Sequence, residues 1–362
     1  MKLLCLTRYG DLGASSRLRV KQYFPYFAEA GISVTWQALL PNAYVSALYS
    51  GKRSVLAAMS GYAARIAFLL KNRHWDVMLI EKEIFPWLPL FAEHVAMPND
   101  TPFVLDFDDA VFHNYELGRN PLKWMLLRNK IDLLMEQATI VTAGSPYLVD
   151  RARRAGCRRV ELVPTVVDLG KYHASFETSE TRLTIGWIGS PATQDYLALV
   201  DAPLRKVCEE FGARVVLVGA RDPGVPRPHY EYRSWSESSE VSDIASFDVG
   251  IMPLPDLPWE RGKCGYKLIQ YMACGKPVVA SPVGANTSIV DHAVNGFLAV
   301  SREEWETHLR ALLSDRDLRI RLGRSGRNTV EDCYSLHSSA ERMTRLLRDA
   351  AASTRMHNRR QP

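Results

Sequence analysis

The sequence predicts an α/β protein made of two doubly wound domains, each a parallel sheet with helices on both faces. Short apolar, β-branched runs alternate with helical patterns along the whole chain, a pattern typical of parallel sheets. The chain has 362 residues, 47% of them hydrophobic. At about 150 residues per domain, this length and composition can supply two separate cores.

The expected strands fall into two groups. In the first half of the chain they are residues 3–7, 33–37, 77–80, 103–106, 140–143 and 160–163. In the second half they are residues 184–188, 214–218, 248–252, 277–280 and 296–300. The polar stretch 171–182, rich in Ser, Thr and Glu, predicts a linker. We therefore expect domains at 1–170 and 171–335, and a C-terminal helix with a basic tail at 336–362 that packs back towards the first domain.

Composition excludes several classes of protein. The six cysteines are scattered without a Cys-x-x-Cys spacing, which predicts a reduced, cytoplasmic protein. No apolar run is long enough to span a membrane. The excess of base is mild, at 45 Lys and Arg against 40 Asp and Glu, so the charge does not indicate a nucleic-acid partner.

The most informative segment, residues 260–280, joins a cationic loop, a short helix and a buried strand. A helix beginning near Lys263 would place Lys263, Lys267 and Gln270 on one face and apolar residues on another. Two lysines at the positive end of a helix complement a diphosphate. Gly275 is expected to end the helix, because glycine adopts the left-handed conformation common there.

This segment resembles the donor-binding stretch of family 4 of the retaining glycosyltransferases (glycosyl transferases group 1), in which a Gly/Lys loop leads into a helix ending Met-Ala-x-Gly-x-Pro-Val-Val-Ala. The run 272–280 has that pattern, and the resemblance covers nearly the whole chain. It implies the GT-B fold, in which two Rossmann-like domains face each other across a cleft.

The resemblance also implies roles for particular residues, with one departure. Most of the family has two glutamates at a fixed spacing, one for the sugar and one for the ribose, but here Gly262 and Gln270 stand at those positions. Gln270 can still bond ribose hydroxyls, and Glu260, two residues early, is the candidate for the sugar. Tyr266 completes the donor-binding residues expected in this segment.

Two further features of the second domain are candidates for donor binding. Gly189 and Ser190 form a turn between a strand and a helix opened by Pro191, where backbone amides can approach phosphate; a plain connection is the alternative. Trp235 lies where the family holds the base, and could stack on it or belong to the core.

The loop after the first strand, residues 7–19, resembles the family loop that faces the donor phosphates and the acceptor. Gly13 and Ser15 would line the cleft, with Ser15 or Ser16 capping the next helix. Arg17 and Arg19 are candidates for binding anions, and surface arginines are the equally weighted alternative.

An acidic run follows the strand that ends at Asp106. Such a run resembles metal-binding and phosphatase motifs, but their companion residues are missing, so no metal site is expected. Within the family resemblance, Asp108 and Asp109 would orient an acceptor hydroxyl at the cleft. A structural cap of the next segment is the alternative.

Two basic amphipathic helices are expected in the first domain. Residues 52–73 carry an apolar stripe flanked by Lys52, Arg53, Arg65, Lys71 and Arg73, and residues 122–137 carry Lys123, Arg128 and Lys130. These helices could lie on an anionic membrane at the inner face and bring the cleft to a lipid-linked acceptor. The alternative is that each stripe simply packs on the sheet.

The resemblance implies a retaining hexosyltransferase that needs no cofactor beyond its nucleotide diphosphate sugar donor and acts on a glycan or glycolipid acceptor in cell-surface polysaccharide synthesis. Lys263 and Lys267 would stabilise the charge that develops on the leaving diphosphate. Two alternatives stay open: a GT-B nucleotide-sugar epimerase, and a non-catalytic nucleotide-sugar-binding scaffold, which the missing glutamate pair suggests.

Overall fold

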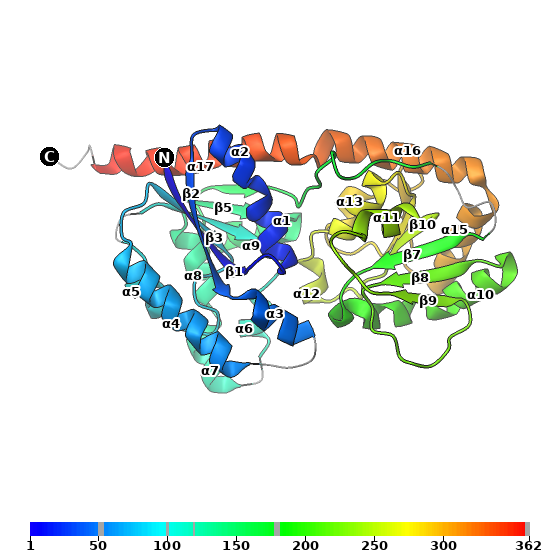
Figure 1. Cartoon of the computed structure of the whole chain (residues 1–362), viewed down its shortest axis with the longest axis horizontal. Coiled ribbons are helices and arrows are strands. Elements are labelled where there is room, and N and C mark those ends of the chain that lie inside the picture. The colour runs from blue at the N-terminus through cyan, green and yellow to red at the C-terminus, as the bar shows by residue number, and fades with distance from the viewer. Residues whose placement is uncertain (50–53, 99–100, 119, 177–181, 359–362) are drawn as a thin grey trace. The chain divides into compact units, whose positions relative to one another are not determined.

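The computed structural model describes residues 1–49, 54–98, 101–118, 120–176 and 182–358 (Figure 1). The chain divides into two compact units. Unit 1 consists of Met1–Thr165 and His337–Pro362, and unit 2 of Val166–Leu336. Residues 177–181 of the expected linker lie outside the described part of the chain.

Unit 1 contains a parallel six-stranded sheet in the order β2-β1-β3-β4-β5-β6. Each of the six strands expected in the first half of the chain is found, with ends shifted by three residues at most. The strands are β1 (Lys2–Tyr9), β2 (Ser33–Leu40), β3 (Val77–Glu81), β4 (Phe103–Phe107), β5 (Ile140–Ala143) and β6 (Val160–Leu162). The residues of β3, β4 and β5 are buried throughout, as the central strands of a sheet covered on both faces should be.

Helices connect the strands of unit 1. They are α1 (Ala14–Arg19), η1 (Lys21–Tyr23), α2 (Phe24–Glu29), α3 (Asn42–Tyr49), α4 (Val55–Lys71), α5 (Leu90–Ala96), α6 (His113–Glu116), α7 (Pro121–Leu127), α8 (Lys130–Gln137) and α9 (Pro146–Arg154). The last helix, α17 (Leu336–Asn358), joins this unit from His337 onward. Its Arg342 pairs with Glu161 of β6 at 2.8 Å.

The expectation for the two basic helices is wrong in part. Lys52 and Arg53 lie outside the described residues. Arg65 does not flank an apolar stripe but is fully buried, donating to the carbonyl oxygens of Thr7, Gln37 and Ile84. The expected helix 122–137 is two helices, α7 and α8, and Lys130 is buried with 2.8 Å contacts to carboxylates of unit 1. A buried cation is stable only with such partners, and these come from distant parts of the chain.

Unit 2 contains a second parallel sheet, in the order β12-β11-β10-β7-β8-β9. Its strands are β7 (Thr184–Ile188), β8 (Arg214–Val218), β9 (Tyr230–Arg233), β10 (Val249–Met252), β11 (Val278–Ala280) and β12 (Gly296–Leu298). Five of them were expected. The sixth, β9, is a partly buried edge strand with the sequence Tyr-Glu-Tyr-Arg, which lacks the apolar run that marks a central strand.

The helices of unit 2 are η2 (Pro191–Leu199), α10 (Asp201–Phe211), α11 (Glu240–Ala245), α12 (Pro258–Arg261), α13 (Tyr266–Ala273), α14 (Asn286–Ile289), α15 (Arg302–Ser314) and α16 (Arg316–Cys333). No helix in the described part of either unit combines the length and the apolar composition needed to cross a bilayer.

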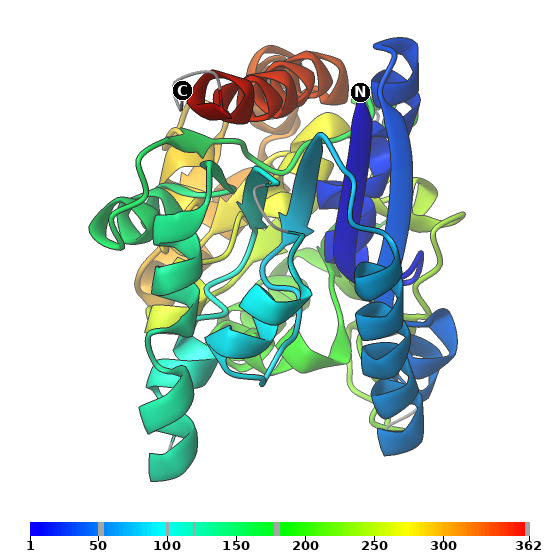
Figure 2. The ribbon, with the colours of Figure 1, turned by 90° about the vertical axis from the view of Figure 1, so that its left-hand side faces the viewer.

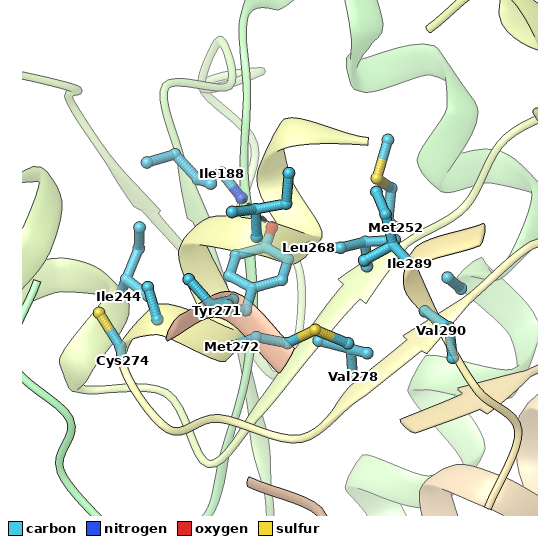
Figure 3. Packing of buried hydrophobic residues seen from close by; sticks show 14 of the residues in the cluster. Ile188, Ile244, Met252, Leu268, Tyr271, Met272, Cys274, Val278, Ile289 and Val290 are labelled. Carbon is cyan, nitrogen blue, oxygen red and sulfur yellow. Dashed lines mark hydrogen bonds between the residues drawn. The ribbon is translucent and has the colours of Figure 1, made fainter. Parts of the chain in front are cut away.

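The helix α13 is held by the core of unit 2 (Figure 3). Leu268 and Met272 are fully buried, and the hydroxyl of the buried Tyr271 accepts from the backbone N–H of Ile188 at the end of β7 (2.9 Å). These contacts fix the helix against the carboxyl end of the central strand.

The helix begins three residues later than the sequence predicted. Its N-cap, Gly265, has φ +67°, and a Cβ there would lie 2.3 Å from Ile289 Cδ1. Both the conformation and the space require glycine. Lys263 therefore lies in the turn between α12 and α13 and does not share a helical face with Lys267 and Gln270. At the other end, Gly275 has φ +72° and follows the last turn, as expected.

Candidate functional site

In unit 2 the candidate site lies at the carboxyl ends of β7 and β8. Gly189 follows β7 and donates its N–H to the carbonyl of Val218 (3.0 Å), and Gly219 follows β8 with φ +80°. The strand β7 pairs with β8 on one side and with β10 on the other. The chain continues from β7 to β8 and β9 on one side of the sheet and then crosses to β10 on the other side, so β7 stands at the point where the strand order changes direction. In open parallel sheets, ligands bind at the carboxyl ends of strands at such a switch point.

Gly189 has no room for a side chain. A Cβ at this position would lie 2.4 Å from Trp187 Cζ2 and 2.7 Å from Lys267 Nζ. Glycine therefore lets the backbone come close to the lysine ammonium. An anion bound here could meet the ammonium and the backbone amides of the turn together.

Lys267 is the second residue of α13, and its side chain crosses towards this turn. The ammonium lies 3.4 Å from the hydroxyl oxygen of Thr193 in η2 and 4.3 Å from the centre of the Trp187 ring. The protein atoms around the ammonium, and to a lesser degree the charge of Lys263, lower the pKa of Lys267 to about 7. A bound anion would relieve both effects.

Lys263 and Ser190 lie at the edges of this arrangement. Lys263 is partly exposed in the turn before α13, where its N–H donates to the carbonyl of Glu260 (3.1 Å). Ser190 precedes η2, and its carbonyl accepts from the N–H of Thr193 (2.9 Å). Pro191 opens that helix, as the sequence predicted.

Glu260 and Tyr266 belong to the same segment. Glu260 is 5% exposed in α12 and accepts a hydrogen bond from the hydroxyl of Tyr196. Its carboxylate is thus held within unit 2 by a residue of η2. Tyr266 opens α13 and packs, partly buried, against the hydrophobic core.

Gln270 takes part in a chain of hydrogen bonds. Its amide Nε2 donates to the hydroxyl of Tyr172 (2.8 Å), and that hydroxyl donates to Glu240 Oε1 (2.6 Å). The other oxygen of Glu240 accepts from the indole N–H of Trp235 (2.7 Å). Trp235 also packs, partly buried, on the core of unit 2. The chain joins Gln270 to Trp235, the two residues expected to contact ribose and base.

In unit 1, the loop after β1 leads into α1. Gly13 is the N-cap of this helix, and no side chain caps it. The expectation that Ser15 or Ser16 caps the helix is therefore wrong. Both serines lie inside the first turn, and their hydroxyls donate to carboxylates beyond it, Ser15 to Asp108 and Ser16 to Glu81.

The two arginines of this loop differ. Arg17 is partly exposed and donates to the carbonyl of Asp11 (3.2 Å). Arg19 is 2% exposed and makes a bidentate pair with Asp106, with N–O distances of 2.9 and 2.6 Å. Its guanidinium stabilises unit 1, so the hypothesis that Arg19 binds a ligand anion is wrong.

Asp108 belongs to a buried charged cluster at the carboxyl ends of β3 and β4. The ammonium of Lys82 lies 2.7 Å from Asp108 Oδ1, 3.0 Å from the Ser15 hydroxyl and 3.9 Å from Asp109 Oδ2. Burial opposes ionisation of Asp108, but Lys82, Arg19 and the hydrogen bonds from Lys82 and Ser15 outweigh it. The pKa of Asp108 is therefore lowered.

Asp109 is the more accessible carboxylate of the pair. Its side chain is 33% exposed, against 15% for Asp108. Among the described residues, no three or more His, Cys, Asp and Glu side chains gather in a way that could hold a metal ion. Because a third of its side chain is exposed, Asp109 can meet a hydroxyl from solvent while the ammonium of Lys82 stays 3.9 Å away.

The sequence reasoning missed Lys82. This lysine has φ +66°, a conformation that favours glycine, and is only 6% exposed. A local signal did exist, because Glu81, Lys82 and Glu83 follow directly on an apolar strand. Charged residues at the carboxyl end of a buried strand are candidates for a site.

It also missed Trp187, Thr193 and Tyr172. Trp187 reads as a core residue of β7 and is indeed buried, yet its ring faces Lys267. Tyr172 lies in the polar stretch that predicted a linker, but it packs in the core of unit 2. No local pattern places these side chains beside residues of α13.

Comparisons with known proteins agree with this architecture. Residues 182–315 match the family model described as Glycosyl transferases group 1. No curated protein matches the chain.

Solved structures match over almost the full length. Sucrose-phosphate synthase from Thermosynechococcus elongatus has 14% identity and a TM-score of 0.71, covering 98% of this chain and 100% of that one. Anabaena HepE, solved in complex with UDP-glucose, has 16% identity and a TM-score of 0.70, with 96% and 100% covered. A glycosyltransferase from Rickettsia africae has 12% identity and a TM-score of 0.67, with 96% and 98% covered.

These findings confirm the predicted fold class. The chain is an α/β protein with two parallel six-stranded sheets that matches GT-B glycosyltransferase structures, and its second unit carries a segment that matches the glycosyl transferases group 1.

Proposed function

We propose that the chain is a retaining glycosyltransferase that moves a hexose-type sugar from a nucleotide diphosphate donor to a glycan or lipid-linked acceptor. The observation that carries the proposal is the ammonium of Lys267, desolvated beside Gly189 and Thr193 at the carboxyl end of β7. A bound diphosphate would place negative charge beside the ammonium of Lys267.

The donor would bind to unit 2. Lys267 would contact the diphosphate, with Lys263 at its exposed side and the amides after Gly189 and Ser190 around it. Gln270 and Trp235 would meet the ribose and base, already oriented by Tyr172 and Glu240. Because HepE was solved with UDP-glucose, uridine diphosphate is the first nucleotide to test.

In the transfer step, the acceptor oxygen forms a bond to the anomeric carbon while the bond from that carbon to the β-phosphate oxygen breaks. The acceptor proton passes to the departing phosphate oxygen on the same face, so configuration is retained. Negative charge grows on the diphosphate, and Lys267 and Lys263 would stabilise it. No residue of the chain has to act as the nucleophile.

Unit 1 would supply the acceptor side. Asp109, with the ammonium of Lys82 3.9 Å away, can accept a hydrogen bond from an acceptor hydroxyl and orient its oxygen. Asp108 and Ser15 hold Lys82 in place. Gly13 and Arg17 lie on either side of Ser15 at the start of α1. We propose that the reaction serves polysaccharide assembly at the cell surface, as the family resemblance implies.

The test begins with a thermal-shift screen across nucleotide diphosphates and nucleotide sugars, because specific binding raises the melting temperature. The donor that binds is then incubated with oligosaccharide acceptors, and proton NMR gives the anomeric configuration of the product. The proposal predicts a product with the configuration of the donor. An inverted product would contradict the retaining mechanism.

The same experiment separates the alternatives. Conversion of the donor to another nucleotide sugar without any acceptor would indicate an epimerase. Binding without turnover of the donor would indicate a nucleotide-sugar-binding scaffold.

A further inference from the structure

Unit 1 exposes an unusual amount of apolar surface on one group of helices. Of the 21 large hydrophobic side chains that are exposed in the described residues, 14 lie between Val55 and Leu133. They come from α4, α5, α7, the start of α8 and the loops beside these helices, which we call the apolar face. Scattered exposed hydrophobics are normal, but a concentration of this kind marks an interaction surface.

The exposed side chains of the apolar face are not part of the core. In α4, Leu56 is 81% exposed and Met59 is 64% exposed. The opposite side of the same helix packs tightly: a Cβ on Gly61 would lie 2.2 Å from the carbonyl oxygen of Leu39, and Arg65 is fully buried. The sheet therefore packs on a different side of α4, and among the described residues Leu56 and Met59 stay mostly exposed.

The helices of the apolar face are linked to one another. The hydroxyl of Tyr62 in α4 donates to the carbonyl of Pro86 in the loop before α5. Trp87 of that loop lies under the ammonium of Lys123 in α7, 3.4 Å from the ring centre. Figure 2 views unit 1 from this side, with α4 in blue towards one edge, the teal helices towards the other edge and cyan segments between them. The exposed residues include Leu70, Phe91, Val95, Leu122, Met125 and Leu126.

The charges on α4 and α7, the two main helices of the apolar face, have one sign. Neither α4 nor α7 contains an Asp or Glu. Exposed or partly exposed cations are Lys71 at the end of α4, Lys123, and Arg128 after α7. The acid of α5, Glu93, is fully buried and lies 2.8 Å from Lys130. The face therefore combines apolar side chains with cations and lacks anions on its two main helices.

Two tryptophans strengthen this interpretation. Trp87 and Trp124 are 43% and 40% exposed. Each has a cation over its ring, Lys123 in the first case and Arg128, 4.0 Å away, in the second. Tryptophan rings gather at the boundary between lipid headgroups and acyl chains, and lysine and arginine stems reach towards anionic headgroups.

We propose that the apolar face docks on an anionic lipid bilayer, with α4 and α7 lying in the headgroup region. A second copy of the chain is a less suitable occupant, because a symmetric pair would bury the cations of each face against a partner whose α4 and α7 carry no carboxylate to offset them. This docking is independent of the transfer reaction, and it would give that reaction access to a lipid-linked acceptor.

The test is flotation of the full chain with vesicles of phosphatidylcholine alone or mixed with phosphatidylglycerol. We expect binding to the mixed vesicles that falls as salt rises. Leu56→Glu and Met125→Glu should each lower the partition coefficient at least about tenfold, because a charge replaces an inserted side chain. Val225→Glu is the matched control, since Val225 is 66% exposed in unit 2.

Circular dichroism and a urea melt of each variant confirm that the fold is kept. Absence of flotation by the wild type, or equal flotation by all three variants, would overturn the proposal. So would sedimentation equilibrium showing a dimer that Leu56→Glu dissociates, which would assign the face to a second copy. Loss of sugar transfer with flotation retained would count against the proposed reaction and leave the docking in place.

Discussion

Replacing Lys267 should have opposite effects on ligand binding and on stability. Lys267→Met removes the charge but keeps an unbranched stem against the Trp187 ring, which lies 4.3 Å from the ammonium in the wild type. A lost charge-assisted phosphate contact costs about 1.5–3 kcal/mol, and about 1.4 kcal/mol is tenfold in affinity. We expect the dissociation constant of a nucleotide diphosphate to rise by roughly 10- to 150-fold.

The fold should become more stable at the same time. The pKa of Lys267 is lowered from 10.5 to about 7 in the folded protein by burial and by Lys263. The unfolded chain therefore binds more protons between these two values. The charged form of Lys267 therefore destabilises the folded protein. This loss of stability is fully present below pH 7 and disappears as the pH rises towards 10.5. The gain from Lys267→Met should be larger in urea melts at pH 6.5 than at pH 9.

The pH also supplies a test of ligand binding in the wild type. Above pH 7, Lys267 of the ligand-free protein is mostly neutral. Binding of the diphosphate must then be accompanied by uptake of a proton by Lys267. Affinity should then fall by up to about tenfold per pH unit, since one pKa unit is about 1.4 kcal/mol. Calorimetry at pH 8 in buffers of different ionisation enthalpy should show uptake of nearly one proton, and Lys267→Met should abolish it.

Two lysine variants serve as controls. Lys263→Met should weaken binding less, because Lys263 is in the turn outside α13, and Lys206→Met should change nothing, because Lys206 pairs with Glu306 on the surface. Unchanged affinity in Lys267→Met, or no proton uptake by the wild type, would refute the role assigned to Lys267.

Three further predictions follow from the same geometry. Gln270→Glu should destabilise unit 2 by about 1–3 kcal/mol in urea melts, more than Gln270→Leu does, because it removes the donor to Tyr172 and sets a second carboxylate near Glu240; equal stability of the two variants would contradict this hydrogen-bond chain. Sugar transfer should persist in EDTA, and complete loss restored by Mg²⁺ or Mn²⁺ would return a metal to the mechanism. Gly265→Ala should cost at least about 1 kcal/mol of stability, since it combines positive φ with a 2.3 Å approach to Ile289; a neutral melt would mean that the turn before α13 relaxes freely.

The strands and the order of the elements could be predicted because the signals are local. A buried parallel strand needs an apolar run, and runs such as 184–188 and 214–218 coincide with β7 and β8. The edge strand β9 could not be found this way, since its polar residues meet solvent. The turn at Gly189 and the segment around Lys267 could be proposed as a site from the sequence, because glycine and lysine are residue types suited to binding phosphate.

The partners of these residues could not be predicted, because they depend on contacts across long stretches of chain. Arg65 looked like a surface cation, yet its guanidinium satisfies carbonyls from three distant positions. Lys82 adopts a strained backbone that places its ammonium between Ser15 and Asp108. Tyr172 connects Gln270 to Glu240 from a stretch that reads as linker. In each case the tertiary environment determines the role of the side chain.

Hydrogen–deuterium exchange with and without a nucleotide diphosphate tests the proposed site most directly. The nucleotide is the one that gives the largest thermal shift, used at saturating concentration. The account predicts slower exchange at residues 189–193 and 263–268, which surround the ammonium of Lys267, and unchanged exchange in α15 on another part of unit 2. Protection confined to other segments, with no change at 189–193 and 263–268, would contradict the assignment of the diphosphate to the carboxyl end of β7.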